Sequence, residues 1–429
     1  MRRTLSRLSS RPFLLCAALV LGAGAGCESV KPRATAPADG TTAIPPPDTT
    51  TASTPDASVI PDAGAPTPTP TTATASPWQR ARVGDRVEYA FSAHRAPPGR
   101  QRVVDPNERG SAVAGRVALE VVAVQAPWAW LTVTFTDDQG RPLPHPRLAQ
   151  DRLLPMRMEE TQAWKAEHRG QRSTEQTTAA GRSWDAQRYL HDSRPSDGPL
   201  QNRLYASEPG PLYLTHGLLD ASTTLSGFGA SGSQQLTLVS FRQGTNATGT
   251  LPVLERPWGP GTWFDVRQDI SGTASVRRVC MGAERGFLLR KEVTGPSGDA
   301  PCADFQEADA LPLEEALLSL VSEVVSLPQQ WPPVPAGTAP SRRETLTVAR
   351  HPIPAVVFET PLGEGVERRV QVTTYAAEPW GAALHGLADE ARFGTLSDTL
   401  FRVPPKGKRV AEDGAQLVGW GAWVKDGGK

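Results

Sequence analysis

Short stretches in which apolar and polar residues alternate recur along the chain from residue 78 onward. Residues 117–124 and 128–135 are rich in β-branched and aromatic side chains, and Gln125-Ala126-Pro127 between them is typical of a hairpin connection. Similar stretches cover 87–91, 235–241, 263–266, 276–281, 287–293 and 369–373. Because a period of two residues indicates half-buried strands, the pattern predicts a mainly β fold of curved antiparallel sheets.

Two stretches have helical periodicity instead. Residues 313–327 place six apolar side chains on one face, and Pro328 ends the pattern. These side chains are Leu313, Leu317, Leu320, Val321, Val324 and Val325. Residues 379–391 begin with proline at the first helical position, although Gly381 and Gly386 weaken this second prediction. We expect both helices to pack on a sheet, with a helix against its concave side.

Two sequence blocks occur twice, in the same order. Tyr205-Ala206-Ser207-Glu208-Pro209 recurs as Tyr375-Ala376-Ala377-Glu378-Pro379, and His216-Gly217-Leu218-Leu219-Asp220 recurs as His385-Gly386-Leu387-Ala388-Asp389. Such self-similarity is typical of a duplicated unit. It predicts two tandem β-rich domains, residues 78–250 and 251–429, the second a diverged repeat of the first. One larger β-rich domain is the alternative.

The N-terminus has a different pattern. Arg2, Arg3, Arg7 and Arg11 precede an apolar run over 13–23, and Gly24-Ala25-Gly26 leads to Cys27. A basic start, a short apolar run and small residues before a cleavage point are the features of a secretory signal peptide. The run has about 11 residues, whereas about 20 are needed to span a bilayer.

Small residues that end at a cysteine resemble the lipobox of bacterial lipoproteins, with Gly24 where that family usually has leucine. The resemblance implies that residues 1–26 are removed and that Cys27 becomes the lipidated N-terminus. Glu28 in place of aspartate favours, by analogy, the outer membrane. We therefore expect a lipid-anchored cell-envelope protein with its domains in the periplasm or at the cell surface. An ordinary signal peptide or a transmembrane anchor is the alternative.

Residues 27–77 separate Cys27 from the folded part. No aromatic residue occurs in 28–77, and 41–77 is mostly Thr, Pro, Ala and Ser. Such a segment cannot bury enough apolar area to offset its ordering entropy. We expect a disordered Thr/Pro/Ala-rich linker that holds the domains away from the membrane. A proline-rich ligand for another protein is the alternative.

The chain has 45 basic and 45 acidic residues, and removal of the four signal-peptide arginines leaves an acidic excess. This balance argues against nucleic acid as a partner and against a basic patch for anionic lipid headgroups. Once Cys16 leaves and Cys27 carries lipid, Cys280 and Cys302 remain, and we expect them to form a disulfide. Two free thiols are the alternative. A metal site is disfavoured because no Cys-x-x-Cys or nearby histidine pair exists.

Two motifs have residue types or spacing found in cofactor or catalytic sites. Residues 227–232 match G-x-G-x-x-G, but a dinucleotide site needs a helix after this turn, and the predicted strand 235–241 follows instead. The repeated His216/Asp220 and His385/Asp389 suggest a hydrogen bond that stabilises a local turn, in preference to a metal site or an acid–base pair. We expect no catalytic residue, cofactor or metal.

Seven tryptophans lie near the ends of predicted strands or domains. They are Trp128, Trp130, Trp258, Trp263, Trp380, Trp420 and Trp423. Such residues more often fill a core or bridge two domains than line a cleft for sugar rings or acyl chains.

These features together predict a non-enzymatic lipoprotein that binds a lipid, a glycan or a partner protein on its concave faces. The layout resembles periplasmic half-barrel carriers of lipoproteins and lipids, which are single curved antiparallel sheets with helices in the cavity. The chain also resembles envelope lipoproteins of GC-rich Gram-negative bacteria over most of its length. A structural component of an envelope assembly is the alternative. A hydrolase of cell-envelope polymer, which needs two carboxylates facing a cleft, is the least favoured.

Overall fold

Strands dominate the structure, and the prediction of a mainly β fold is confirmed. The computed structural model describes residues 76–95, 111–143, 145, 148–149, 152–160, 162–196, 198–227, 230–245, 248–250, 261–295, 302, 305–325, 339–348, 350–363, 368–377 and 395–423. The predicted signal peptide, Cys27, the predicted linker up to Ala75 and the predicted helix over 379–391 lie outside these residues. Among the described residues, no helix has the length and hydropathy needed to cross a membrane.

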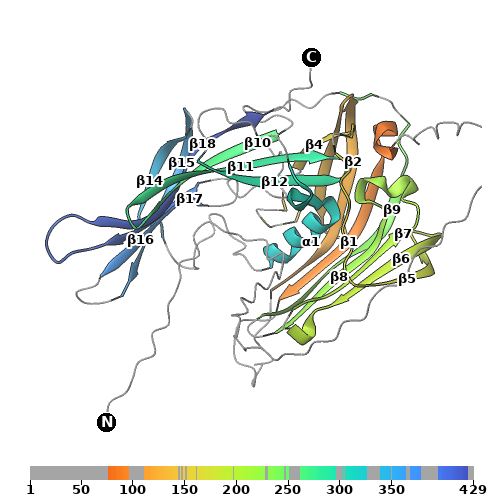
Figure 1. The fold of residues 1–429 in the computed structure, drawn as a ribbon, viewed down its shortest axis with the longest axis horizontal. Coiled ribbons are helices and arrows are strands. Elements are labelled where there is room, and N and C mark those ends of the chain that lie inside the picture. The colour runs from red at the N-terminus through yellow and green to blue at the C-terminus, as the bar shows by residue number, and fades with distance from the viewer. Residues whose placement is uncertain are drawn as a thin grey trace, which may run out of the picture. The chain divides into compact units, whose positions relative to one another are not determined.

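In the described residues, the first half of the chain forms a sheet of nine antiparallel strands, here called the first sheet (Figure 1). Along the sheet the strand order is β4-β3-β2-β1-β9-β8-β7-β6-β5. The strands are β1 (Arg86–Arg95), β2 (Ser111–Gln125), β3 (Trp128–Thr136), β4 (Arg152–Arg157), β5 (Gln171–Ala179), β6 (Arg182–Asp192), β7 (Leu200–Ala206), β8 (Leu218–Gly227) and β9 (Ala230–Arg242). Short 3-10 helices lie at η1 (Pro77–Arg80), η2 (Arg194–Ser196) and η3 (Gly210–Thr215).

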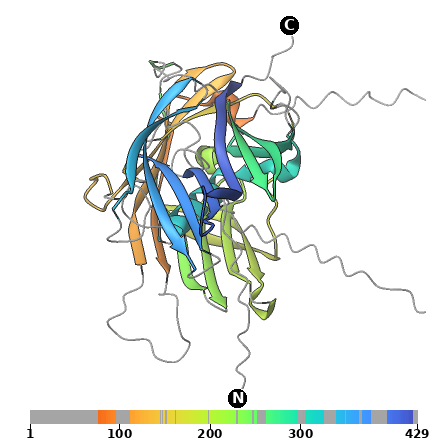
Figure 2. The same cartoon turned by 90° about the vertical axis from the view of Figure 1, so that its left-hand side faces the viewer.

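The second half forms the second sheet, which faces the viewer in Figure 2. Its strand order is β13-β12-β11-β10-β18-β17-β16-β15-β14. The strands are β10 (Gly261–Ile270), β11 (Thr273–Glu284), β12 (Phe287–Thr294), β13 (Ala310–Pro312), β14 (Arg342–Val348), β15 (His351–Leu362), β16 (Arg369–Ala376), β17 (Thr395–Arg402) and β18 (Val410–Trp423). The helices η4 (Glu307–Asp309) and α1 (Leu313–Val324) flank β13.

The second strand order is the first order shifted by nine strands, and irregularities in the ladders repeat with it. The register of β1 against β9 shifts at Glu88/Tyr89, and that of β10 against β18 shifts at Asp265/Val266. A shift at Leu204/Tyr205 between β7 and β8 recurs at Thr374/Tyr375 between β16 and β17. The repeated tyrosines of the sequence therefore occupy equivalent ladder positions. This correspondence supports a duplicated unit, while the domain boundary at residue 250 stays a prediction.

Several hairpins close through two residues with positive φ. Ser271 and Gly272 join β10 to β11 with φ of 49° and 81°, and Arg285 and Gly286 join β11 to β12 with φ of 44° and 84°. Such turns match the right-handed twist of the flanking strands, and glycine adopts their second position without steric cost. The two predicted hairpins, 128–135 after 117–124 and 287–293 after 276–281, are both present.

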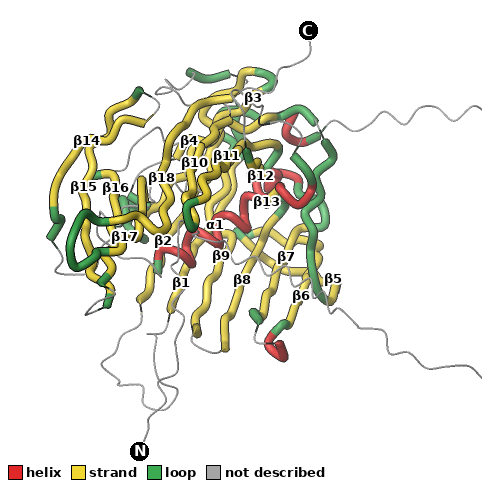
Figure 3. The backbone as a smooth tube through the Cα atoms, turned by 60° about the vertical axis from the view of Figure 1, so that its left-hand side comes forward, coloured by secondary structure: helices red, strands yellow, loops and turns green. Residues whose placement is uncertain are grey.

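Helix α1 packs against the first sheet, although the chain places it between two strands of the second (Figure 3). It ends three residues before the predicted 327, at Val324, and residues 326–338 lie outside the described part. Its predicted apolar face is buried, with Leu317 and Val321 fully covered. The face of the first sheet that carries Val87, Leu119 and Leu131, here called the inner face, shares one core with α1.

The second sheet has a separate apolar core, and the first half contributes to it. Phe264, Met281 and Ile353 of the second sheet pack with Ala123 and Trp130, which point away from the inner face of the first sheet. Each half therefore contributes to the core of the other. The second half contributes α1 to the core of the first sheet, and the first half contributes Ala123 of β2 and Trp130 of β3 to the core of the second sheet.

We expect truncation of the α1 face to destabilise the protein strongly. Leu317→Ala removes a fully buried side chain, and such changes lower the free energy of unfolding by about 2–5 kcal/mol. Leu190→Ala, at a position that is 40% exposed, is the control and should change it by less than about 0.5 kcal/mol. Urea unfolding followed by tryptophan fluorescence measures both. Equal effects would show that α1 contributes no core.

Candidate functional site

A group of ionisable side chains is buried where the first turn of α1 meets the first sheet. Glu314 has no exposed surface, and His216 Nδ1 lies 3.1 Å from each of its carboxylate oxygens. The hydroxyl of Tyr205 on β7 donates to Oε1 of Glu314 at 3.3 Å. A helix N-terminus favours a carboxylate through the helix dipole. Glu314 thus joins a helix of the second half to two residues of the first.

His216 occupies a strained backbone position that aims its ring at α1. It ends η3 with a φ of 53°, in the left-handed region that non-glycine residues seldom adopt. Its ring packs on Phe287, with centroids 4.4 Å apart. Nε2 is buried and has no hydrogen-bond partner among the described residues. The ring is therefore held between α1 and the β11–β12 turn.

The expected hydrogen bond between His216 and Asp220 is wrong, because Glu314 is the partner of the histidine. Asp220 lies opposite Thr237 in the β8–β9 ladder and accepts a hydrogen bond from that hydroxyl at 2.8 Å. Strand alternation directs Asp220 toward this neighbour and away from α1. The repeated His385 and Asp389 lie outside the described residues.

A second ion pair joins the same turn of α1 to β7. The guanidinium of Arg203 donates to Glu315 Oε2 at 2.9 Å, to the backbone oxygen of Ser222 at 2.6 Å and to Thr223 Oγ1 at 3.1 Å. Arg203 is almost fully buried. Since a buried guanidinium is costly unless it is paired and hydrogen-bonded, these contacts make the position of α1 specific.

Aromatic rings pack beside these ionisable side chains. His168, in the segment before β5, lies between Tyr189 and Tyr205, with ring centroids 4.5 and 4.3 Å away. We call His168, Arg203, Tyr205, His216, Glu314 and Glu315 the α1 cluster. Sequence reasoning missed four of them, although two adjacent glutamates at the start of an apolar helix were a usable signal.

Burial and charge act in opposite directions within the α1 cluster. Complete burial disfavours ionised Glu314, but the charge and hydrogen bond of His216 outweigh it and hold the pKa of the Glu314 carboxyl below its usual value. Burial lowers the pKa of His168, against the opposing charges of Glu314 and Glu315. Burial, together with the charge of Glu314, raises the pKa of Tyr205 well above its usual value. The cluster therefore holds an ionised carboxylate beside a protonated phenol.

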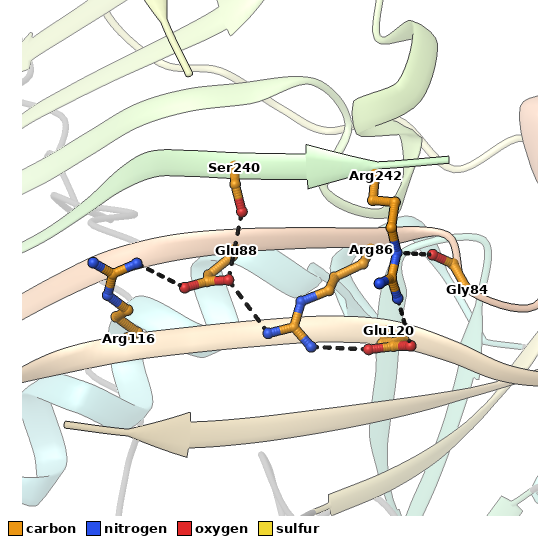
Figure 4. Close-up of polar contacts among 7 residues, drawn as sticks. All are labelled: Gly84, Arg86, Glu88, Arg116, Glu120, Ser240 and Arg242. Atoms are coloured by element: carbon orange, nitrogen blue, oxygen red, sulfur yellow. Dashed lines mark hydrogen bonds and ion pairs between the residues drawn. The ribbon is translucent and has the colours of Figure 1, made fainter. Parts of the chain in front are cut away.

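The outer face of the first sheet carries a charged network (Figure 4). Strand alternation that turns Val87 inward turns Arg86 and Glu88 outward. Glu88 pairs with Arg86 at 3.3 Å and Arg116 at 3.0 Å, and Glu120 pairs with Arg86 at 2.8 Å and Arg242 at 2.9 Å. Despite partial burial, the two arginines hold the pKa of Glu88 below its usual value. The network crosses β2, β1 and β9 and reinforces their register.

The predicted disulfide is present. Cys280 on β11 bonds to Cys302, with their Cα atoms 5.4 Å apart. Both cysteines are buried in a small core with Phe287, Leu289 and Phe305. The disulfide fastens the chain after β12 to the side of the second sheet that faces away from the Phe264–Ile353 core.

The other candidate residues of the sequence have structural positions. Of the G-x-G-x-x-G motif, residues 228–229 lie outside the described part; Gly227 pairs with Ala230, where β9 begins five residues earlier than predicted, so a strand and not a helix follows. Trp130 and Trp420 are buried in the second core, and Trp263 lies against Gly419 and Gly421 of β18. Trp258, Trp380 and the side chain of Trp423 are outside the described part. Among the described residues, no group of His, Cys, Asp and Glu is arranged to hold a metal ion.

A family model described as "Family of unknown function (DUF6068)" matches residues 49–428. The chain belongs to the DUF6068 family. The match covers both sheets of this DUF6068 member, as well as α1 and the disulfide. No curated protein and no solved structure matched the chain.

We expect Glu314→Gln to remove a pH-dependent contribution to stability. The folded-state pKa of Glu314 lies below its unfolded value of 4.5. Its contribution is therefore complete above that pH and is lost as the pH falls through the folded pKa. Near neutral pH the variant should lose about 1–3 kcal/mol of unfolding free energy. The difference from the wild type should shrink at acidic pH.

Urea unfolding at several pH values measures this difference. The control is Glu175→Gln, whose partly exposed carboxylate pairs with Arg188 at 2.7 Å; it should cost less than about 1 kcal/mol. Loss of the His168 contribution begins higher, as the pH falls below 6.5, and the variant lacks the Glu314 charge that opposes the lowering of the His168 pKa. A Glu314→Gln difference that is independent of pH would contradict a role for the ionised carboxylate.

Proposed function

We propose that this protein is a lipid-anchored, non-enzymatic protein of the cell envelope, at the outer membrane, that binds a lipid, glycan or protein partner. Cys27 carries the anchoring part of this proposal, because it ends a basic and apolar signal-like segment in a row of small residues. The Thr/Pro/Ala-rich linker that follows suits a spacer between a membrane and a folded unit.

The coverage of both apolar sheet faces carries the binding part of the proposal. Glu314, His216 and Arg203 each contact protein groups that fasten α1 to the first sheet. Helix α1 covers the apolar inner face of the first sheet. The apolar face of the second sheet packs against Ala123 of β2 and Trp130 of β3. Covered apolar faces favour recognition by exposed surfaces over enclosure of a ligand. The same observation supports the second candidate, a structural component of an envelope assembly.

We expect Cys27→Ala to abolish lipid attachment. In a Gram-negative host fed labelled palmitate, the wild-type protein should carry the label and fractionate with membranes, whereas Cys27→Ala should do neither. Cys16→Ala is the matched control, since Cys16 lies inside the removed segment, and it should behave as the wild type. Label retained by Cys27→Ala would show that this cysteine is not the lipidation site.

Native mass spectrometry separates surface binding from enclosure. We expect residues 27–429 carrying Cys27→Ser, purified from the periplasm, to have the mass of the polypeptide alone, because both apolar faces are occupied by protein side chains. A lipid or acyl chain that copurifies at fixed stoichiometry would contradict surface binding and would identify a carried ligand.

A further inference from the structure

One end of the second sheet carries most of the exposed large aliphatic side chains. Five such residues occur in the described part of the chain, and three of them are Ile270, Val410 and Leu362, which are 58%, 47% and 39% exposed. Ile270 and Leu362 are the last residues of β10 and β15, and Val410 is the first residue of β18. Antiparallel pairing brings these strand ends to the same end of the sheet, at the left in Figure 1.

These side chains share one face. Leu362 pairs with Arg369, Arg369 with Arg402, and Arg402 with Val410. Directly paired residues project from the same side of a sheet, so two arginines lie in a row between two aliphatic residues. Ile270 pairs with Asp413, and Asp413 pairs with Leu400, two residues from Arg402 on β17. Ile270 therefore projects from this face as well.

Among the described residues, basic side chains outnumber acidic ones at this end, although Asp269 and Asp413 lie beside Ile270, in contrast with the acidic excess expected of the mature chain. Arg369 and Arg402 share the single carboxylate of Glu412, at 2.9 and 3.5 Å. The β17–β18 connection adds Lys406 and Lys408, which are exposed and form no ion pair with a described residue. Glu364 and Glu367 of the neighbouring β15–β16 connection lie outside the described residues, so the inference rests on the β17–β18 connection and the paired row.

We propose that this end, the basic tip formed by Ile270, Leu362, Arg369, Arg402, Lys406, Lys408 and Val410, docks the protein on an anionic phospholipid bilayer. Lysine and arginine near a membrane surface are attracted to anionic headgroups. Exposed aliphatic side chains beside them bury apolar area at the boundary of headgroups and acyl chains. The basic tip would orient the second sheet toward the membrane. A lipid on Cys27 cannot do this through a long linker.

Vesicle binding of unlipidated protein tests the basic tip separately from the anchor. Residues 27–429 with Cys27→Ser are mixed with vesicles of phosphatidylcholine alone, or of phosphatidylcholine with about one third phosphatidylglycerol, and pelleted. The test variant is Lys406→Glu/Lys408→Glu. The matched control is Lys165→Glu/Arg172→Glu, which makes the same change in charge at exposed positions beside and within β5. Circular dichroism checks that each variant is folded.

The expected result is binding to anionic but not neutral vesicles, about tenfold or more weaker for Lys406→Glu/Lys408→Glu and unchanged for the control. The proposal is overturned if the protein binds neither vesicle, binds both equally, or loses binding equally in both variants. If the test variant does not fold, a salt titration of the unsubstituted protein decides: binding must fall as salt rises. Each of these outcomes leaves the Cys27 proposal untouched, since no lipid is attached.

Discussion

Burial of α1 on the inner face of the first sheet is the interaction on which the rest of the structure depends. A sheet with one apolar face needs a second layer to cover it, and the first half supplies no long helix of its own among the described residues. The second half provides that layer through Leu317, Leu320 and Val321. The two halves therefore share a core, although their strands pair in separate ladders apart from one bridge between Arg157 and Glu284.

Polar contacts determine where α1 sits on this apolar surface. Hydrophobic burial has little directionality, so an apolar helix face alone would tolerate a shift along the sheet. Pairing of Glu314 with His216 and of Glu315 with Arg203 allows one position, because a shift would leave buried charges without partners. The left-handed backbone of His216 is consistent with this role, since a strained residue persists only where its surroundings hold it.

The strand order of the first half repeats in the second half, but the two sheets are covered differently. The order and two of its ladder irregularities repeat after nine strands. The inner face of the first sheet is nevertheless covered by a helix, whereas Phe264, Met281 and Ile353 of the second sheet pack against Ala123 of β2 and Trp130 of β3. The two sheets therefore have the same strand order but are covered by different elements. The charged surfaces differ as well. Arginines on the outer face of the first sheet are paired with glutamates, whereas the lysines of the basic tip are exposed.

Local patterns in the sequence determined the elements. Alternation predicted strands that all lie within observed strands, and the apolar stripe over 313–327 predicted α1, because both depend on periodicities of a few residues. The number of cysteines predicted the Cys280–Cys302 bond, because only these two remain once Cys16 and Cys27 are assigned to the N-terminal segment. Only the tertiary structure decided that α1 covers the other half, that His216 meets Glu314 and not Asp220, and that exposed aliphatic and basic residues gather at one sheet end. These contacts join residues about a hundred positions apart. No local periodicity specifies which distant surface an apolar or charged side chain will meet.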